Sequence, residues 1–300
     1  MWSYTSDWLI SISSNILVRL GELALTGFRK RDSEVVQPPC STFKEKQIAE
    51  LEKTEVSEIA ERFQTVLKLM NEGRRYDKFT VSTLARIMGL SRTSELEEVF
   101  HGKKDPLFEF KSKFCETFSV NYEWLEYGSG HPYDDNEQTD FFYLSNYFSE
   151  IKELDPEGII FVRAETQAAQ AFIILKLSDW EYKVLPEIWH ISGNIGNGGE
   201  KRLFNLYKLI IKIDGSDFYS KCEGITLPKE EFDALSSGER FPGKYAQAIG
   251  NDYWWDDLTD VYHELHPSLN NGYERMYGRS FIEAQEIIKR NIEQFKRLRS

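Results

Sequence analysis

Acidic and histidine side chains near the C-terminal end have the residue types that metal and acid–base chemistry use. Asp256, Asp260 and His263 follow at spacings of four and three, so on a helix they would share one face. His263 and His266 are three residues apart, and both imidazoles could reach one metal ion. Only two residues separate them, however, so the His-Glu-x-x-His pattern of zinc hydrolases is missing. With Asp257 in the same run, a solvated acidic face is the favoured interpretation. A metal pair is the alternative.

Residues 194–199 form a second candidate, a loop rich in glycine and asparagine before a possible helix. Such a loop can present backbone N–H groups to a phosphate, and Lys201 and Arg202 would add positive charge. The segment lacks both the P-loop pattern and the dinucleotide-binding glycine pattern. An ordinary surface loop is therefore favoured over a phosphate site.

No residue pattern points to nucleophilic catalysis. His190, beside a tryptophan, is interpreted as a hydrogen-bonded core or edge histidine. The three cysteines, Cys40, Cys115 and Cys222, are odd in number and far apart. This favours a reducing compartment, and we expect neither disulfides nor a cysteine zinc site. We therefore expect no catalytic residues, no metal, no cofactor and no enzyme. An active site near the glycine loop or the acidic cluster is the alternative.

Charge and hydropathy limit the partners. The formal charge of −12 argues against tight non-specific nucleic-acid binding, although it permits a local basic patch. The apolar run at residues 8–18 is broken by Arg19 and Glu22 before it reaches the roughly 20 residues of a membrane-spanning helix. It is interpreted as an amphipathic helix, with a membrane-surface anchor as the alternative. We expect a cytoplasmic protein with no membrane partner.

Apolar periodicity predicts helices in the first half of the chain. Residues 1–43 are interpreted as an amphipathic segment and a linker, whose Pro38-Pro39 pair stops helix formation. Gly89 is expected to end a short helix in the left-handed conformation, and Ser91 to cap the next one. The expected helices are 44–71, 80–88, 92–100, 107–118 and 120–125.

The pattern changes in residues 134–300. Two apolar runs of strand length, 158–163 and 171–177, stand between helical patterns, whereas 214–250 looks rich in loops. Because strands and helices mix without a regular β-α-β repeat, the expected class is α+β. The expected helices here are 141–153, 202–213 and 281–298.

Several motifs in residues 79–133 resemble the Cro/lambda-repressor-like helix-turn-helix family. They are Leu84-Ala85, Gly89-Leu90-Ser91, Gly102-Lys103-Lys104, Pro106, and Phe118-Ser119-Val120 followed by Trp124-Leu125 and by Gly128-Ser129-Gly130. The resemblance implies a helical domain of about residues 56–133, within a 44–133 unit. The chain would then be a multidomain protein, with an all-α helix-turn-helix domain followed by an α+β domain.

This resemblance implies that the second helix of the motif enters the major groove of double-stranded DNA. Arg92, Thr93 and Ser94 would occupy its exposed first turn and contact bases or nearby phosphates. Lys103 and Lys104, just past the helix, would contact the phosphate backbone. We expect a transcriptional regulator that binds an operator as a homodimer, with a C-terminal domain for sensing or dimerisation.

Acidic residues on the same helix support a different interpretation. Glu95, Glu97 and Glu98 would repel phosphates if they faced DNA. Residues 74–133 hold nine Lys and Arg and nine Asp and Glu, so their formal charge is 9 − 9 = 0. The alternative is a protein-interaction or defence-associated module that keeps the fold without binding DNA. A protein partner or a small ligand at the C-terminal domain is also considered.

Overall fold

The computed structural model describes residues 41–134, 147–246, 252–262 and 272–298, with side chains from Glu55 onward. The apolar run at 8–18 and the Pro38-Pro39 pair lie outside these residues. The chain divides into two units after Ala49, and the second, residues 50–300, contains every element below apart from the first residues of the first helix. No helix in the described ranges is both long and apolar enough to cross a membrane.

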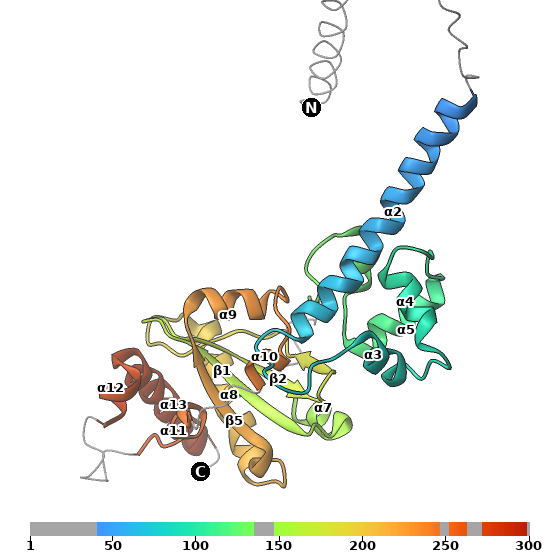
Figure 1. Cartoon of the computed structure of the whole chain (residues 1–300). Helices are drawn as coiled ribbons and strands as arrows, with labels where there is room; N and C mark the ends of the chain where they lie inside the picture. Colours follow the sequence, from blue (N-terminus) through green and yellow to red (C-terminus); the bar gives the residue numbers. More distant parts are fainter. Residues whose placement is uncertain (1–40, 135–146, 247–251, 263–271, 299–300) are drawn as a thin grey trace, which may run out of the picture. The chain divides into compact units, whose positions relative to one another are not determined.

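The described chain from Ser41 to Tyr127 forms helices only (Figure 1). They are α2 (Ser41–Met70), α3 (Val81–Ile87), α4 (Thr93–Phe100), α5 (Phe108–Phe118) and α6 (Tyr122–Tyr127). The first helix begins earlier than expected, since residues 41–43 were assigned to a linker. The apolar pattern on which the expected start rested begins only after these residues, so it could not fix the first turn of the helix.

A tightly packed core joins these helices. Phe63 and Val66 of α2 and Phe114 of α5 are fully buried, with the Phe63 and Phe114 ring centroids 4.4 Å apart. The Arg62 guanidinium donates hydrogen bonds to the carbonyls of Leu125 (3.1 Å) and Glu126 (2.8 Å). These carbonyls lie at the end of α6, where helix carbonyls lack partners of their own. Arg62 therefore fixes the end of α6 against α2.

A mixed sheet forms the centre of the second part of the chain. Its described strands are β1 (Gly158–Ala164), β2 (Gln170–Lys176), β3 (Tyr182–Val184), β4 (Trp189–His190) and β5 (Cys222–Leu227). The order is β3-β2-β1-β5, with β4 also paired to β2. β1 is parallel to β5, and the other pairs are antiparallel. The expected α+β class is confirmed for this part.

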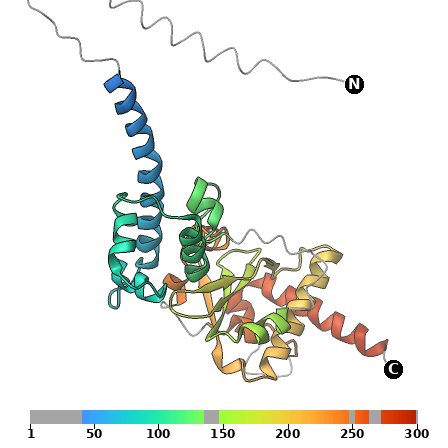
Figure 2. The same cartoon turned by 90° about the vertical axis from the view of Figure 1, so that its right-hand side faces the viewer.

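Helices cover both faces of the sheet (Figure 1). Ile160 and Val162 of β1 pack with α9 (Lys229–Ser236), whereas Ile159 and Phe161 pack with α8 (Asn197–Asp214) and α13 (Arg279–Arg297). Figure 2 shows the same helices after a quarter turn. Burial on both sides explains why β1 and β2 are continuous apolar runs and not alternating patterns. The remaining described helices are α7 (Tyr147–Leu154), α10 (Gly243–Ala246), α11 (Trp254–Asp257), α12 (Gly272–Tyr277) and the 3₁₀ turn Tyr219–Lys221.

The expectation of a loop-rich segment at 214–250 is wrong. This segment holds β5, α9 and α10. The strand β5 has the sequence CEGITL, and only its Gly224 and Ile225 are buried. It therefore lacks the continuous apolar run that marks β1 and β2 in the sequence. The helix expected at 141–153 is α7 where it is described, and residues 141–146 lie outside the described part.

The helical part and the sheet part share one hydrophobic cluster. The Tyr133 N–H donates to the Gly238 carbonyl at 2.9 Å. The Phe241 ring centroid lies 5.3 Å from that of Tyr133 and 5.3 Å from that of Tyr182 on β3. The expected boundary between 133 and 134 therefore falls where buried rings from both parts meet.

Candidate functional site

The chain that enters α3 is held by side-chain hydrogen bonds. Asn71 accepts from the Phe79 N–H at 2.7 Å and donates to the Phe79 carbonyl at 2.8 Å, closing the loop after α2. The Thr80 hydroxyl then accepts from the Thr83 N–H at 3.1 Å. This is a helix cap, so α3 starts where the sequence predicted.

The turn between α3 and α4 is built on a glycine. Gly89 has φ +67°, a left-handed conformation that other residues adopt only with strain. The Leu90 N–H donates to the Ala85 carbonyl at 2.9 Å and closes the end of α3. Ala85 of α3 and Leu96 of α4 are both buried. The expected glycine turn between two short packed helices is confirmed as local geometry.

The start of α4 differs from the expectation. Ser91 was predicted to cap a helix starting at Arg92, but Arg92 itself takes the capping position, with φ −143° and no side-chain capping bond. The turn thus extends one residue further, and the helix begins at Thr93. The Thr93 hydroxyl donates to the Ser82 hydroxyl at 3.5 Å, a weak link between α4 and α3.

The five residues predicted to contact DNA lie around this turn and just past α4. Arg92, Ser94, Lys103 and Lys104 are exposed, and Thr93 is half-buried. Among the described side chains, none forms an ion pair with Arg92, Lys103 or Lys104. These cations are therefore open to a partner from outside the chain.

The glutamates of α4 are exposed to different degrees. Glu97 and Glu98 are exposed, whereas Glu95 is half-buried in the first turn. A carboxylate in the first turn interacts favourably with the positive end of the helix dipole. Glu95 therefore has a role in helix stability, while Glu97 and Glu98 add negative charge to the exposed surface.

An apolar cavity of about 650 Å³ lies where the helical part meets the sheet part. Its lining includes the rings of Phe118, Tyr133, Tyr182 and Phe241, which come from both parts of the chain. The sequence did not reveal it, because Phe118 and Phe241 are far apart along the chain. A strip of aromatic residues is also the usual content of a hydrophobic core.

A second cavity, of about 640 Å³, is lined mostly by polar residues and includes Asp256 and Asp257 of the acidic cluster singled out from the sequence. Asp257 accepts a hydrogen bond from the Tyr277 hydroxyl at 2.6 Å, and Asp256 accepts from Tyr219 at 3.4 Å. Asp260, nearby in sequence, accepts from the Tyr273 hydroxyl at 3.1 Å. These three carboxylates are half-buried and hold tyrosines of neighbouring elements, so the acidic face is solvated only in part.

Burial perturbs the acid–base chemistry of this polar cavity. Burial raises the pKa of the Asp256 carboxyl, and neighbouring carboxylates raise it further. Burial lowers the pKa of the Arg163 guanidinium, which is nevertheless a strong base. Arg163 donates to the Tyr277 carbonyl at 2.7 Å.

His263 and His266 lie outside the described residues. Within the described ranges, no three His, Cys, Asp or Glu side chains are placed to hold a metal.

The segment 194–199 is a loop only in its first half, because residues 197–199 form the first turn of α8. Gly196 takes the capping position and provides no side-chain capping bond. Arg202 forms an ion pair with Glu187 at 3.5 Å, and Glu187 is buried. Because this arginine has a partner, a phosphate at the loop would find Lys201 as the remaining cation of the predicted pair. His190 on β4 is exposed at the edge of the sheet.

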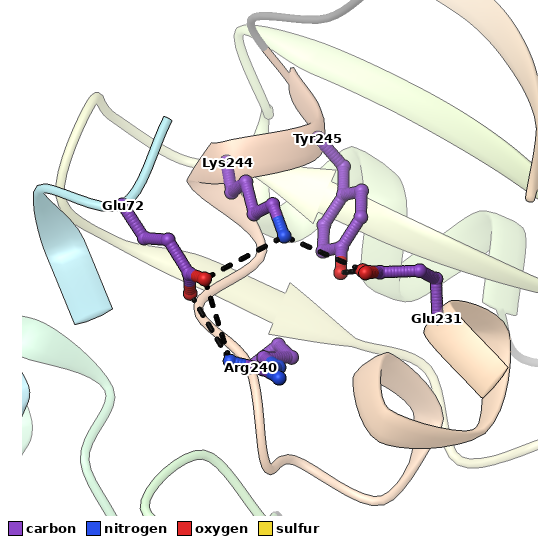
Figure 3. A network of polar contacts seen from close by, with 5 residues as sticks. All are labelled: Glu72, Glu231, Arg240, Lys244 and Tyr245. Carbon is purple, nitrogen blue, oxygen red and sulfur yellow. Dashed lines mark hydrogen bonds and ion pairs between the residues drawn. The ribbon is translucent and has the colours of Figure 1, made fainter. Parts of the chain in front are cut away.

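A network of charges links the end of α2 to α9 and α10 (Figure 3). Glu72 lies 3.3 Å from Arg240 and 3.8 Å from Lys244, which is 3.4 Å from Glu231. The Tyr245 hydroxyl donates to Glu231, and this hydrogen bond is the main cause of the lowered pKa of Glu231. Two carboxylates balance two cations. The network is therefore a structural link between the helical and sheet parts.

The described cysteines have no features of reactive thiols. Cys115 is buried, and burial raises its pKa to about 12. Burial likewise raises the pKa of Cys222 to about 12. A nucleophilic cysteine requires a lowered pKa, so neither thiol is activated. Cys40 lies outside the described residues.

No protein-family model, characterised protein or solved structure matches the chain. The open cations around α4 and the two cavities are therefore the features from which a function can be inferred.

Proposed function

We propose that residues 56–133 form a Cro/lambda-repressor-like helix-turn-helix domain that binds double-stranded DNA, and that the protein regulates transcription. One observation carries the proposal: a glycine turn joins two short packed helices, and Arg92 and Ser94 are exposed at the start of the second. This is the position from which a recognition helix contacts base edges.

Each predicted residue has a distinct role in this proposal. The exposed Arg92 guanidinium reads guanine, and Ser94 contacts a base edge or a phosphate. Thr93, half-buried beside Ser82, orients the first turn and reaches the backbone. Lys103 and Lys104 contact phosphates on one side of the helix. A homodimer in the cytoplasm would engage two half-sites, with residues 134–300 sensing a signal or dimerising.

The test is a mobility-shift titration of the full chain with genomic fragments that it recovers in a pull-down at low salt. Arg92→Ala should lose about 1–3 kcal/mol of discrimination at one base pair and retain non-specific binding. Lys103→Ala should weaken binding to all sequences and lower the salt slope by roughly one. Arg275→Ala and Lys296→Ala are the controls, because both side chains are exposed on helices of the sheet part.

The alternative proposal is a protein-interaction module without DNA binding. Leu107 is 70% exposed and Phe108 is 67% exposed, and only Asp105 and Pro106 separate them from the basic pair Lys103-Lys104. Adjacent exposed apolar side chains of this size are typical of protein contact surfaces. This alternative is favoured if the wild-type chain gives no mobility shift at micromolar protein and low salt, or if Arg92→Ala binds DNA as wild type does.

A further inference from the structure

The polar cavity lies at the carboxyl ends of two parallel strands. Arg163 near the end of β1, Glu165 just past it and Thr226 near the end of β5 all line the cavity. The backbone of Asp252, another lining residue, approaches β5 closely, since a Cβ on Gly224 would lie 1.9 Å from the Asp252 carbonyl oxygen. The carboxyl ends of parallel strands are a common place for ligand sites, and about 640 Å³ is enough for a small molecule.

One arginine in the wall of this cavity is buried without an ion pair. Arg163 is 6% exposed, and no described carboxylate forms an ion pair with it. Its Nη2 atom donates to the Tyr277 carbonyl, and its Nε atom is enclosed without a partner. The third nitrogen, Nη1, also has no partner among the described residues but is not enclosed, so it is the guanidinium nitrogen open to the cavity. Buried charges are usually paired, so Nη1 points to an anionic group from outside the chain.

Carboxylates outnumber cations in the same wall. Glu165, Asp252, Asp256 and Asp257 line the cavity against Arg163 alone, a formal charge of 1 − 4 = −3. Glu165 is exposed, and the three aspartates are half-buried. Burial lowers the pKa of Arg163, and Asp252 and Glu165 partly offset this, so both carboxylates lie near the guanidinium without pairing with it. A ligand that satisfies both signs of charge has one carboxylate and a larger positive charge.

Accessible aromatic and thioether side chains complete the wall. Tyr253 is 54% exposed, Tyr219 is 39% exposed and Met276 is 65% exposed, and all three line the cavity. The face of a tyrosine ring attracts cations, and a planar guanidinium group can also stack on it. These side chains therefore favour a ligand whose positive charge is carried on an extended organic group.

We propose that the polar cavity binds a free α-amino acid with a cationic side chain. The ligand carboxylate pairs with Nη1 of Arg163, and the α-ammonium group pairs with Glu165 and Asp252. The cationic side chain of the ligand lies against the Tyr253 ring, with Asp256 in the same wall. This gives a ligand class to the sensing role proposed for residues 134–300. The proposal does not require DNA binding, and its test measures ligand binding alone, so the two proposals can fail separately.

The test uses three probes that differ by one group: L-arginine, agmatine, which lacks the carboxylate, and L-citrulline, whose side chain is uncharged. Isothermal titration calorimetry of the full chain at low salt measures their affinities. We expect L-arginine to bind most tightly. Agmatine leaves Arg163 without an anion, and L-citrulline leaves the carboxylates and rings without a second cation. Each should therefore bind about ten-fold more weakly, the effect of one lost charge-assisted contact.

Glu165→Gln separates a binding role from a structural one. The Glu165 carboxylate is exposed and has no partner among the described side chains, so the melting temperature should not fall. The affinity for L-arginine should nevertheless drop about three- to ten-fold. Glu230→Gln is the matched control, because it removes the same charge from an exposed position on α9, away from the cavity, and should leave binding almost unchanged.

Arg163→Gln tests the contact with the ligand carboxylate. Because Arg163 is buried, the readout is the ratio of the L-arginine and agmatine affinities, which does not depend on the fraction of folded chain. This ratio should fall from about ten to about one. If this variant does not fold, Glu165→Gln and the three probes still decide the question. The proposal is overturned if the wild-type chain does not bind millimolar L-arginine, if agmatine binds as tightly as L-arginine, or if Glu165→Gln leaves the affinity unchanged.

Discussion

A buried ion pair in the helical part shows what single residues contribute to this fold. The Lys111 ammonium lies 2.6 Å from the Glu126 carboxylate, with side chains 4% and 12% exposed. The Lys111 ammonium also lies 4.5 Å from the centre of the Phe108 ring. Removing one partner of such a pair leaves the other charge buried without compensation, whereas replacing both by apolar residues is often neutral.

Lys111→Met should therefore lower the free energy of unfolding by roughly 3 kcal/mol. The double variant Lys111→Met/Glu126→Leu should recover most of this loss, because no charge then remains buried. Urea unfolding of the two variants and wild type measures both values. A neutral single variant, or a double variant less stable than the single one, would contradict this account.

At this scale the sequence predicted exposure better than pairing. Arg92, Ser94, Lys103 and Lys104 are exposed as their positions around a short helix indicated. The Lys111–Glu126 pair could not be predicted, because lysine and glutamate on amphipathic helices usually face solvent. Their burial depends on how α5 and α6 pack, which local spacing does not determine.

Elements with a strong apolar pattern were the ones that the sequence predicted. β1, β2 and α13 each bury a continuous run or a regular stripe, and their expected ranges agree with the structure to within two residues. α8 begins at Asn197, five residues before its expected start, because the segment predicted as a glycine-rich loop continues into the helix. β5 was missed because its burial comes from pairing with β1, which lies about 60 residues earlier in the chain. The apolar cavity was missed for the same reason, since its walls meet only in the folded chain.

The contact between α9 and the end of the helical part depends on one glycine. Gly238 has φ +76°, and a Cβ there would lie 2.2 Å from the Asp134 nitrogen. Gly238→Ala should destabilise the protein by at least about 2 kcal/mol, from the backbone conformation and the clash together.

Gly198→Ala is the matched control for this prediction. Gly198 lies in the first turn of α8, and a Cβ there meets nothing within 4 Å. This change should be neutral or stabilise the protein by up to about 1 kcal/mol, since alanine favours helix more than glycine does. Thermal and urea unfolding compare the two variants. Equal effects would show that the approach of Gly238 to residues 133 and 134 is not needed for stability.

The whole molecule carries a formal charge of −12, and its carboxyl groups are perturbed in opposite directions. Burial raises the pKa of the Glu181, Glu187 and Asp256 carboxyls. Hydrogen bonds from Lys176 and Tyr245, respectively, lower the pKa of Asp179 and Glu231. The first group is more easily protonated in the folded chain than in the unfolded chain, and the second group less easily.

The two groups predict a stability maximum at mildly acidic pH. Where Glu181, Glu187 and Asp256 titrate, the folded chain binds more protons, so the free energy of unfolding rises as the pH falls from about 7 towards about 5. A decrease in net negative charge acts in the same direction. Below about pH 4, protonation of Asp179 and Glu231 removes interactions that exist only with their charged forms, and stability falls again.

Asp256→Asn isolates one source of this pH dependence. The amide oxygen can still accept from Tyr219, but the buried charge is gone, so the variant should gain stability at pH 7 and show a shallower rise towards pH 5. Glu274→Gln, exposed on α12, removes the same charge from the surface and should leave the slope almost unchanged. Urea unfolding at intervals between pH 4 and pH 8 measures both. A wild-type stability that increases steadily from pH 5 to pH 8 would refute the assignment, because the buried carboxyls would then favour their charged forms in the folded chain.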